Sequence, residues 1–193
     1  MSLEQNFMEE KKMIKASSLR NQEELKKISS KPGYYKWWVP KTELDFILNV
    51  LDISFLEIER VLETKDDLFC VYVGIAAKES VGSRLNWHIN DSHSISRVKN
   101  GTLSTLRQTV ASIVSHNQYD KLSTDLFIDK MFVEYFCMDF PIKSDAAKIK
   151  LHIIEKKLMD EYFRILNIRD NHHPFSQKAK LKLKCLRKAS KQF

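Results

Sequence analysis

The stretch LFCVYVGI, residues 68–75, is the clearest structural signal in the chain. An uninterrupted apolar run of this length is typical of a strand that is buried on both faces. Two other segments have strand character: an aromatic run over 34–39, which ends at Pro40, and a run over 130–138, which ends near Pro141. Pro interrupts the hydrogen bonding of a sheet, so it is a natural end for both. The sequence therefore predicts a sheet of about three strands.

Helical periodicity accounts for most of the remaining chain. Apolar residues recur every three or four positions, which is the spacing that buries one face of a helix. Ser144 can cap the longest of these segments, and residues 90–100 are expected to be a polar loop. The pattern favours an α/β (α+β) fold, in which a small three-stranded mixed or antiparallel sheet is flanked by helices, with helical extensions at both termini. The predicted helices are 3–28, 42–64 in two pieces, 78–89, a segment after Gly101, 144–165 and a final basic segment.

Composition is that of a globular protein. The chain has 193 residues, of which 43% are apolar and 30% charged, with 4 Gly and 4 Pro, and this excludes disordered and collagen-like classes. No apolar run approaches the roughly 20 residues of a membrane helix. Three cysteines without a CxxC pair predict free thiols in a reducing, cytoplasmic setting. We divide the chain into an N-terminal helical extension (1–30), a central domain (31–170) and a basic C-terminal helical tail (171–193).

The net charge of +7 is concentrated at one end of the chain. Residues 171–193 contain seven of the 32 basic residues and no acidic residue, so the other residues carry 25 basic and 25 acidic groups. A polyanion such as nucleic acid is the natural partner of such a segment. A solvated basic helix face explains the charge pattern equally well.

Chemically versatile side chains occur at defined places on the predicted elements. A Gly-x-Tyr motif begins one strand and a Tyr-x-Gly motif lies in the next. An Arg and a His four residues apart share a helix face, a Glu lies on or beside the apolar stripe of the long helix, and an Asn follows that helix. Each has an ordinary alternative role, namely packing, a solvated helix face or a helix C-cap. In order, the residues are Gly33, Tyr35, Tyr72, Gly74, Arg84, His88, Glu155 and Asn167.

In this order, over roughly residues 31–170, the motifs resemble the GIY-YIG nuclease superfamily. The sequence departs from the usual pattern in two places. The 36 residues between Tyr35 and Tyr72 are more than a short hairpin needs, which implies an inserted helical segment, as in some restriction-enzyme branches. Ile75 follows Tyr-x-Gly where some repair members carry Lys, so any lysine-assisted proton transfer would have to use Lys78 or be absent.

The resemblance implies roles for the two tyrosines and the asparagine. A tyrosine can act as a general base when a nearby cation favours the phenolate, although its free pKa is about 10. Tyr72 is the expected base. Tyr35 is expected to position water or phosphate and could exchange roles with Tyr72. Asn167 would orient the site from nearby.

The resemblance assigns the phosphate and the metal to three other side chains. A guanidinium can bind a phosphate bidentately, and Arg84 is expected to hold the scissile phosphate. His88 would hydrogen-bond the phosphate or a tyrosine hydroxyl. Glu155 would hold one Mg²⁺ (or Mn²⁺), a hard cation that accepts one carboxylate together with waters and phosphate oxygens.

The expected function is a metal-dependent endonuclease that hydrolyses DNA and leaves 5′-phosphate and 3′-hydroxyl ends. The alternatives are a catalytically inactive nucleic-acid-binding module of the same fold and a helical interaction protein. The presence of every catalytic residue type favours the enzyme. No membrane partner is expected, and both a monomer and a homodimer are compatible with the sequence. Additional contacts to nucleic acid are expected from Lys78, Lys99, Arg107, His173, Lys178, Lys180, Lys182, Lys184 and Arg187.

Overall fold

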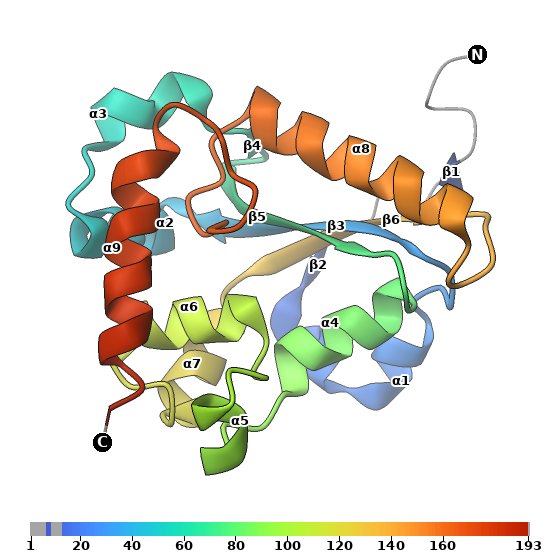
Figure 1. Cartoon of the computed structure of the whole chain (residues 1–193), viewed down its shortest axis with the longest axis horizontal. Helices are drawn as coiled ribbons and strands as arrows, with labels where there is room; N and C mark the ends of the chain where they lie inside the picture. Colours follow the sequence, from blue (N-terminus) through green and yellow to red (C-terminus); the bar gives the residue numbers. More distant parts are fainter. Residues whose placement is uncertain (1–6, 9–12, 193) are drawn as a thin grey trace.

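The computed structural model describes residues 7–8 and 13–192 (Figure 1). These residues form one antiparallel sheet in the order β1-β6-β3-β5-β4, with β2 also paired to β6. The α+β class is as predicted, whereas the expected number of three strands is wrong, because the described residues contain six. The strands are β1 (Phe7–Met8), β2 (Met13–Lys15), β3 (Gly33–Pro40), β4 (Thr64–Lys65), β5 (Leu68–Ala76) and β6 (Phe132–Met138).

The three predicted strands are the centre of this sheet. β3 lies between β5 and β6 and pairs with both along most of its length. The additional strands are short and lie at the edges, where β2 covers β6 and β4 covers only the start of β5. From Cys70 to Ala76 the outer edge of β5 therefore has no strand partner among the described residues. The candidate site lies at this open edge.

The predicted helix over 3–28 is wrong where the structure describes it. Met13–Lys15 forms β2, a 3₁₀ helix follows over Ala16–Arg20 (η1), and only Gln22–Lys26 is α-helical (α1). Residues 3–6 and 9–12 lie outside the described part. Pairing with β6 satisfies the backbone of β2, and Leu19 is fully buried in the core. Tertiary packing therefore overrides the weak helical pattern of this polar segment.

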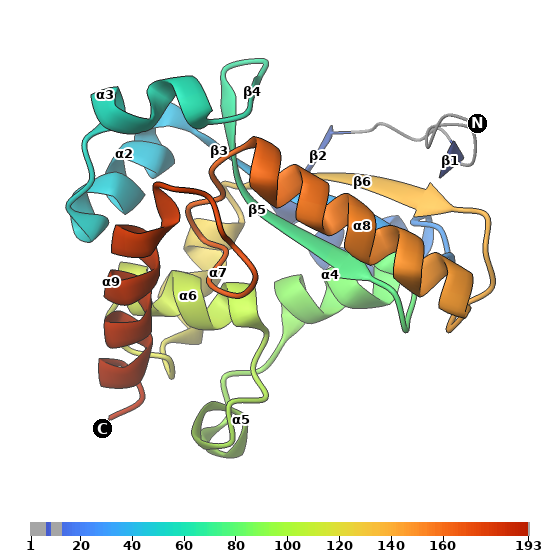
Figure 2. The same cartoon turned by 45° about the horizontal axis from the view of Figure 1, so that its top comes forward.

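Helices cover both faces of the sheet (Figures 1 and 2). On one face α8 packs over Trp38, Cys70 and Ala77 through Leu151 and Leu158. The larger core lies on the opposite face beneath the other helices. The remaining elements are α2 (Lys41–Leu51), α3 (Phe55–Ile58), η2 (Glu59–Val61), α4 (Val81–Asn90), α5 (Ile95–Lys99), α6 (Thr105–Val114), α7 (Lys121–Ile128), α8 (Asp145–Glu161) and α9 (Ser176–Ala189).

Most of the predicted helices are present. The helix predicted in two pieces over 42–64 is present as α2 and as α3 with η2, although it ends at Val61 and Thr64 already belongs to β4. Helices α4, α6, α8 and α9 agree with the periodicity. Two short helices were not predicted. The segment expected to be a polar loop contains α5, whose N-terminus is capped by Ser94, and α7 follows α6. None of the described helices combines the length and the apolar character needed to cross a membrane.

Helix α9 is part of the core. Ala179 and Leu183 are buried in the main hydrophobic cluster, and the helix packs against α6 and α2. Figure 1 shows it upright beside these two helices. The basic segment is thus held rigidly against the body of the protein, and any role of its lysines must be read from its orientation.

Candidate active site

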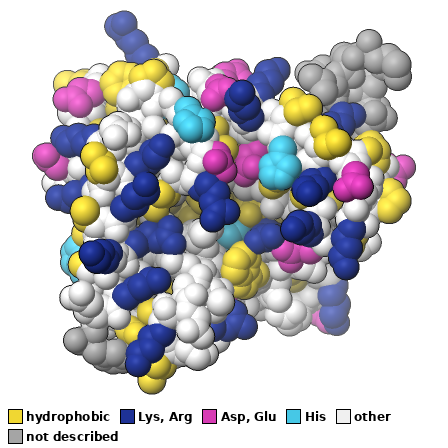
Figure 3. Space-filling view, in the orientation of Figure 1, with side chains coloured by type: hydrophobic (Ala, Val, Ile, Leu, Met, Phe, Trp, Pro, Cys, Tyr) yellow, Lys and Arg dark blue, Asp and Glu magenta, His cyan; other side chains and the backbone are white. Residues whose placement is uncertain are grey.

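A pocket of about 490 Å³ opens at the free edge of β5. It lies where α8, from one face of the sheet, and α4 and α6, from the other, approach this edge. Figure 3 shows a central hollow on this side of the molecule, bordered by Lys and Arg side chains. The structure brings all of the sequence-predicted catalytic residues to this one pocket: Tyr35, Tyr72, Arg84, His88, Glu155 and Asn167.

The two glycines of the motifs have steric roles. Tyr35 on β3 lies opposite Gly74 on β5, and a Cβ at Gly74 would be 2.4 Å from the Tyr35 hydroxyl. A Cβ at Gly33 would be 2.0 Å from the Phe136 carbonyl oxygen of β6. Only Gly leaves room at either place. The strands can therefore lie close together while the Tyr35 ring crosses over Gly74.

A chain of hydrogen bonds runs from helix α6 into the pocket. Tyr35 Oη lies 2.7 Å from His88 Nε2, and His88 Nδ1 lies 2.5 Å from Ser104 Oγ. Ser104 is the N-cap of α6, and its hydroxyl oxygen accepts the backbone N–H of Arg107 at 3.4 Å. If the Ser104 hydroxyl donates its proton to Nδ1, the hydrogen of the neutral imidazole lies on Nε2. In this arrangement His88 donates to Tyr35, and the Tyr35 proton is directed into the pocket.

Burial keeps these groups uncharged. It lowers the pKa of His88 to about 3, and the nearby positive charges of Arg84 and Arg107 add to this effect. It raises the pKa of Tyr35 well above its ordinary value. Burial also raises the pKa of Tyr72, where a hydrogen bond with Thr105 partly opposes the effect. Both phenols are therefore neutral at neutral pH, and forming a phenolate requires additional positive charge in the pocket.

Arg84 lines the pocket from α4. Its Nη2 forms an ion pair with Glu79 at 2.5 Å, and its guanidinium lies 4.8 Å from the centre of the Trp87 ring. These two contacts fix the direction of the group. Nε is buried and has no hydrogen-bond partner among the described residues. A buried charged donor without a partner is costly. The Arg84 side chain also lines the pocket, where a guanidinium can bind an anionic ligand.

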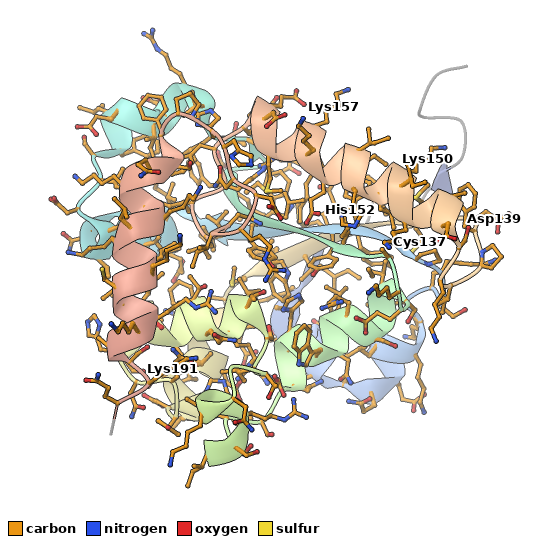
Figure 4. All side chains as sticks on the ribbon, viewed as in Figure 1. Cys137, Asp139, Lys150, His152, Lys157 and Lys191 are labelled. Atoms are coloured by element: carbon orange, nitrogen blue, oxygen red, sulfur yellow. The ribbon has the colours of Figure 1, made fainter. Side chains whose placement is uncertain are left out.

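Glu155 enters the pocket from α8. Burial raises the pKa of this carboxyl to about 7, and the negative charge of Asp170 contributes in the same direction. Its partner in the described part is His152, whose Nδ1 lies 3.6 Å from Oε2. Figure 4 labels His152 on the same helix. No group of three metal-ligating side chains occurs among the described residues. One carboxylate beside open space nevertheless suits Mg²⁺, which retains waters and takes phosphate oxygens.

Asn167 closes the open edge of β5. Its Oδ1 accepts the backbone N–H of Val73 and its Nδ2 donates to the Val73 carbonyl, both at 2.9 Å. The side-chain amide thus replaces a neighbouring strand at the central residue of the Tyr-x-Gly motif. Through these bonds Asn167 ties the segment after α8 to the strand that carries Tyr72.

Several residues of the pocket were not predicted. Arg169 and Asp170 follow Asn167 in an irregular segment, for which periodicity gives no signal. His152 lies one helical turn before Glu155, and this i, i+3 spacing was the available clue. Arg187 was expected only as part of a basic tail, but it reaches the pocket from α9. The additional lining residues with polar or aromatic groups are Trp87, Thr105, Thr109, His152, Arg169, Asp170 and Arg187.

Two expected contacts to nucleic acid are contradicted by burial. Arg107 is fully buried and forms an ion pair with Asp125. His173 is 8% exposed and stacks between the rings of Phe163 and Phe175. The two contacts were predicted from charge and residue type, and neither property shows whether a side chain is buried.

The expected lysine contacts occupy different environments. Lys178 forms an ion pair with Asp52, and Lys180 donates to the Asn171 carbonyl. Lys78 and Lys99 are exposed and do not line the pocket. Lys184 and Arg187 line a second groove, and Lys182 does not.

Comparison with known proteins agrees with this geometry. A family model described as the GIY-YIG catalytic domain matches residues 33–189, a range that includes both motif strands, the Arg and His of α4, Glu155 and all of α9. No curated protein and no solved structure matches the chain. The family model covers far more than half of the sequence, and the chain therefore belongs to the GIY-YIG family of nuclease-type hydrolases.

Proposed function

We propose that the protein is a metal-dependent endonuclease that hydrolyses DNA phosphodiester bonds in the pocket at the edge of β5. The observation that carries the proposal is the meeting of the Arg84 guanidinium and the Glu155 carboxylate in one pocket. An anion and a cation would satisfy these two groups together. A phosphodiester with a divalent metal ion supplies both.

Arg84 binds the scissile phosphate in this mechanism. Glu79 and Trp87 already fix its guanidinium, so little side-chain freedom is lost when the phosphate arrives. The guanidinium then opposes the charge that develops on the phosphate oxygens as the bond breaks, which is the main form of catalysis in phosphoryl transfer.

The two tyrosines have different tasks. Tyr72 is half-buried and reaches the pocket beside Thr105, and we assign it as the general base that takes a proton from the attacking water. Tyr35 is held by His88 and directs its proton into the pocket, where it orients water or phosphate. The base must lose its own proton first, and positive charge from Arg84 and a bound cation favours the phenolate.

Glu155 would hold Mg²⁺ or Mn²⁺ in this scheme. The cation, when bound, supplies charge neutralisation at the phosphate and the leaving oxygen. The contribution of the chain is a single carboxylate whose neighbours leave space for water and phosphate. Asn167 acts as a positioning residue, since it holds the backbone between Tyr72 and Gly74.

Plasmid cleavage tests the proposal. Purified protein with supercoiled DNA and Mg²⁺ should produce nicked and linear products, and EDTA should stop the reaction. Glu155→Gln should lower the rate about a hundredfold or more, while the affinity for DNA in EDTA is retained. Glu161→Gln, on the exposed side of the same helix, is the matched control and should cleave normally. Arg84→Ala should weaken both cleavage and binding.

The inactive-module alternative makes the opposite prediction. It expects the parental protein to bind DNA without cleaving it at any Mg²⁺ or Mn²⁺ concentration. Cleavage by Glu155→Gln at the parental rate would show that the carboxylate holds no essential metal. In that case the mechanism above is wrong even if the protein is a nuclease.

A further inference from the structure

A second groove of about 310 Å³ adjoins the pocket. Arg187 and Ile168 line both cavities, so the two spaces meet at the Arg187 side chain. No acidic residue is among its described lining residues. Figure 3 shows that Lys and Arg side chains follow this flank of the molecule. We call it the α9 groove, and it is lined by Gln108, Ile168, Lys184, Arg187, Lys188 and Lys191.

The lysines of α9 that line the groove differ from Lys178 and Lys180 in their partners. In the first half, Lys178 pairs with Asp52 and Lys180 binds the Asn171 carbonyl. In the second half, Lys184 and Lys188 line the α9 groove, and no ion pair involves them in the described part of the chain. The ammonium of Lys191 lies beside Gly101, and Figure 4 labels this residue at the end of α9. Unpaired positive charge is thus gathered along one groove.

Buried hydrogen bonds hold the groove in place. Gln108 of α6 is 2% exposed. Its Nε2 donates to the Leu103 and Gly101 carbonyls, and its Oε1 accepts a hydrogen bond from Arg187 Nη2. The end of α9 is fixed by Gln118, which donates to the Arg187 carbonyl at 2.7 Å and to Ser190 Oγ at 3.0 Å. The cations are therefore presented by a rigid wall, and Arg187 is fixed at the junction with the pocket.

We propose that the α9 groove binds the sugar-phosphate backbone of duplex DNA on one side of the cleaved bond. The inference rests on the proposed function, because it takes the pocket to be where the scissile phosphate binds. Arg187 contacts the strand where it leaves the pocket, and Lys184, Lys188 and Lys191 contact successive phosphates beyond. Such contacts carry no base specificity and set the register of the strand at the pocket.

Two variants that remove the same charge from the same helix test the inference. Lys184→Gln/Lys188→Gln changes the groove. Lys178→Gln/Lys182→Gln changes α9 outside it. Affinity for a short labelled duplex of mixed sequence is measured in EDTA across a range of salt concentrations. Each lost phosphate contact lowers the slope of log affinity against log salt by about 0.9. The groove variant should therefore lose a slope of about 1.8, while the control retains the parental slope.

Equal changes of slope in the two variants would overturn the inference, because only the net charge would then matter. An unchanged slope in the groove variant would also overturn it. Thermal unfolding confirms that both variants are folded. If the parental protein binds DNA with a steep salt dependence but never cleaves plasmid in Mg²⁺, the proposed nuclease function is wrong and the proposed DNA binding by the α9 groove still stands. If the parental protein cleaves plasmid and both variants keep the parental salt slope, the proposed DNA binding by the α9 groove is wrong and the proposed nuclease function still stands.

Discussion

Ser104 uses one hydroxyl group both to cap helix α6 and to contact His88. Loss of this hydroxyl removes the donor that keeps the His88 hydrogen on Nε2, so Tyr35 is no longer oriented in one way. We expect Ser104→Ala to lower kcat about tenfold, or ~1.4 kcal/mol of transition-state stabilisation, with little change in DNA affinity. Nitrogen NMR of His88 should report a mixture of tautomers in the variant.

The loss of a helix cap is a separate effect and needs its own control. Ser144 caps α8 with the same geometry, accepting the Ala147 N–H at 3.4 Å, and it contacts no histidine in the described structure. Ser144→Ala should lose about 1 kcal/mol of stability and keep its kcat. A single His88 tautomer and full activity in Ser104→Ala would show that the cap is its only role.

Asn167 can be tested through the backbone that it binds. Asn167→Asp replaces the donor facing the Val73 carbonyl with a second acceptor. We expect the variant to lose about 1–3 kcal/mol of unfolding free energy and much of its cleavage activity. Hydrogen exchange at the Val73 amide should become faster, because Asn167 holds this group at the open edge of β5. Unchanged exchange at Val73 would contradict the strand-replacing role.

At the scale of elements, strong patterns were predictable and short elements were not. β3, β5 and β6 are long apolar or aromatic runs, and α8 has a sustained helical period, so local sequence specifies them. β2 and β4 contain two or three residues, too few to show a period. They exist because an edge of the sheet offers unpaired backbone groups. The helix predicted over 3–28 is therefore wrong at Met13–Lys15, because these residues pair with β6.

The same rule holds for the site. Regular elements carry Tyr35, Tyr72, Arg84 and His88, so their elements could be predicted, and the resemblance of their motifs to the GIY-YIG pattern assigned them to one site. Arg169 and Asp170 come from an irregular segment, and their approach depends on how Asn167 binds β5. Helix α9 shows a second reason why part of the site could not be predicted. The sequence shows the positive charge of this helix but not its orientation. The packing of Leu183 against the core decides which of its lysines face the α9 groove.

At the scale of the whole molecule, two buried histidines contribute to the response to acid. Burial lowers the pKa of His88 to about 3 and of His93 to about 4. His93 Nδ1 lies 2.7 Å from the Gln118 carbonyl oxygen, and its Nε2 accepts from Arg107, so a second ring proton has no place. The unfolded chain takes up these protons below pH ~6.5 and the folded chain does not. Both histidines therefore make stability fall as the pH drops from about 6.5 towards 4.

The effect of Glu155 on stability in acid is opposite in sign to that of the two histidines. Its pKa of about 7 in the folded protein exceeds the unfolded value of about 4.3, so between these values the folded state holds more protons and gains stability as the pH falls. In the metal-free protein this gain offsets part of the loss from the histidines. Glu155→Gln removes the offset together with a buried charge. We expect it to be about 1–3 kcal/mol more stable than the parent at pH 8 in EDTA, and the advantage should shrink towards pH 5. Urea unfolding at several pH values measures the difference, and an advantage that stays constant with pH would mean that Glu155 titrates alike in the folded and unfolded chains.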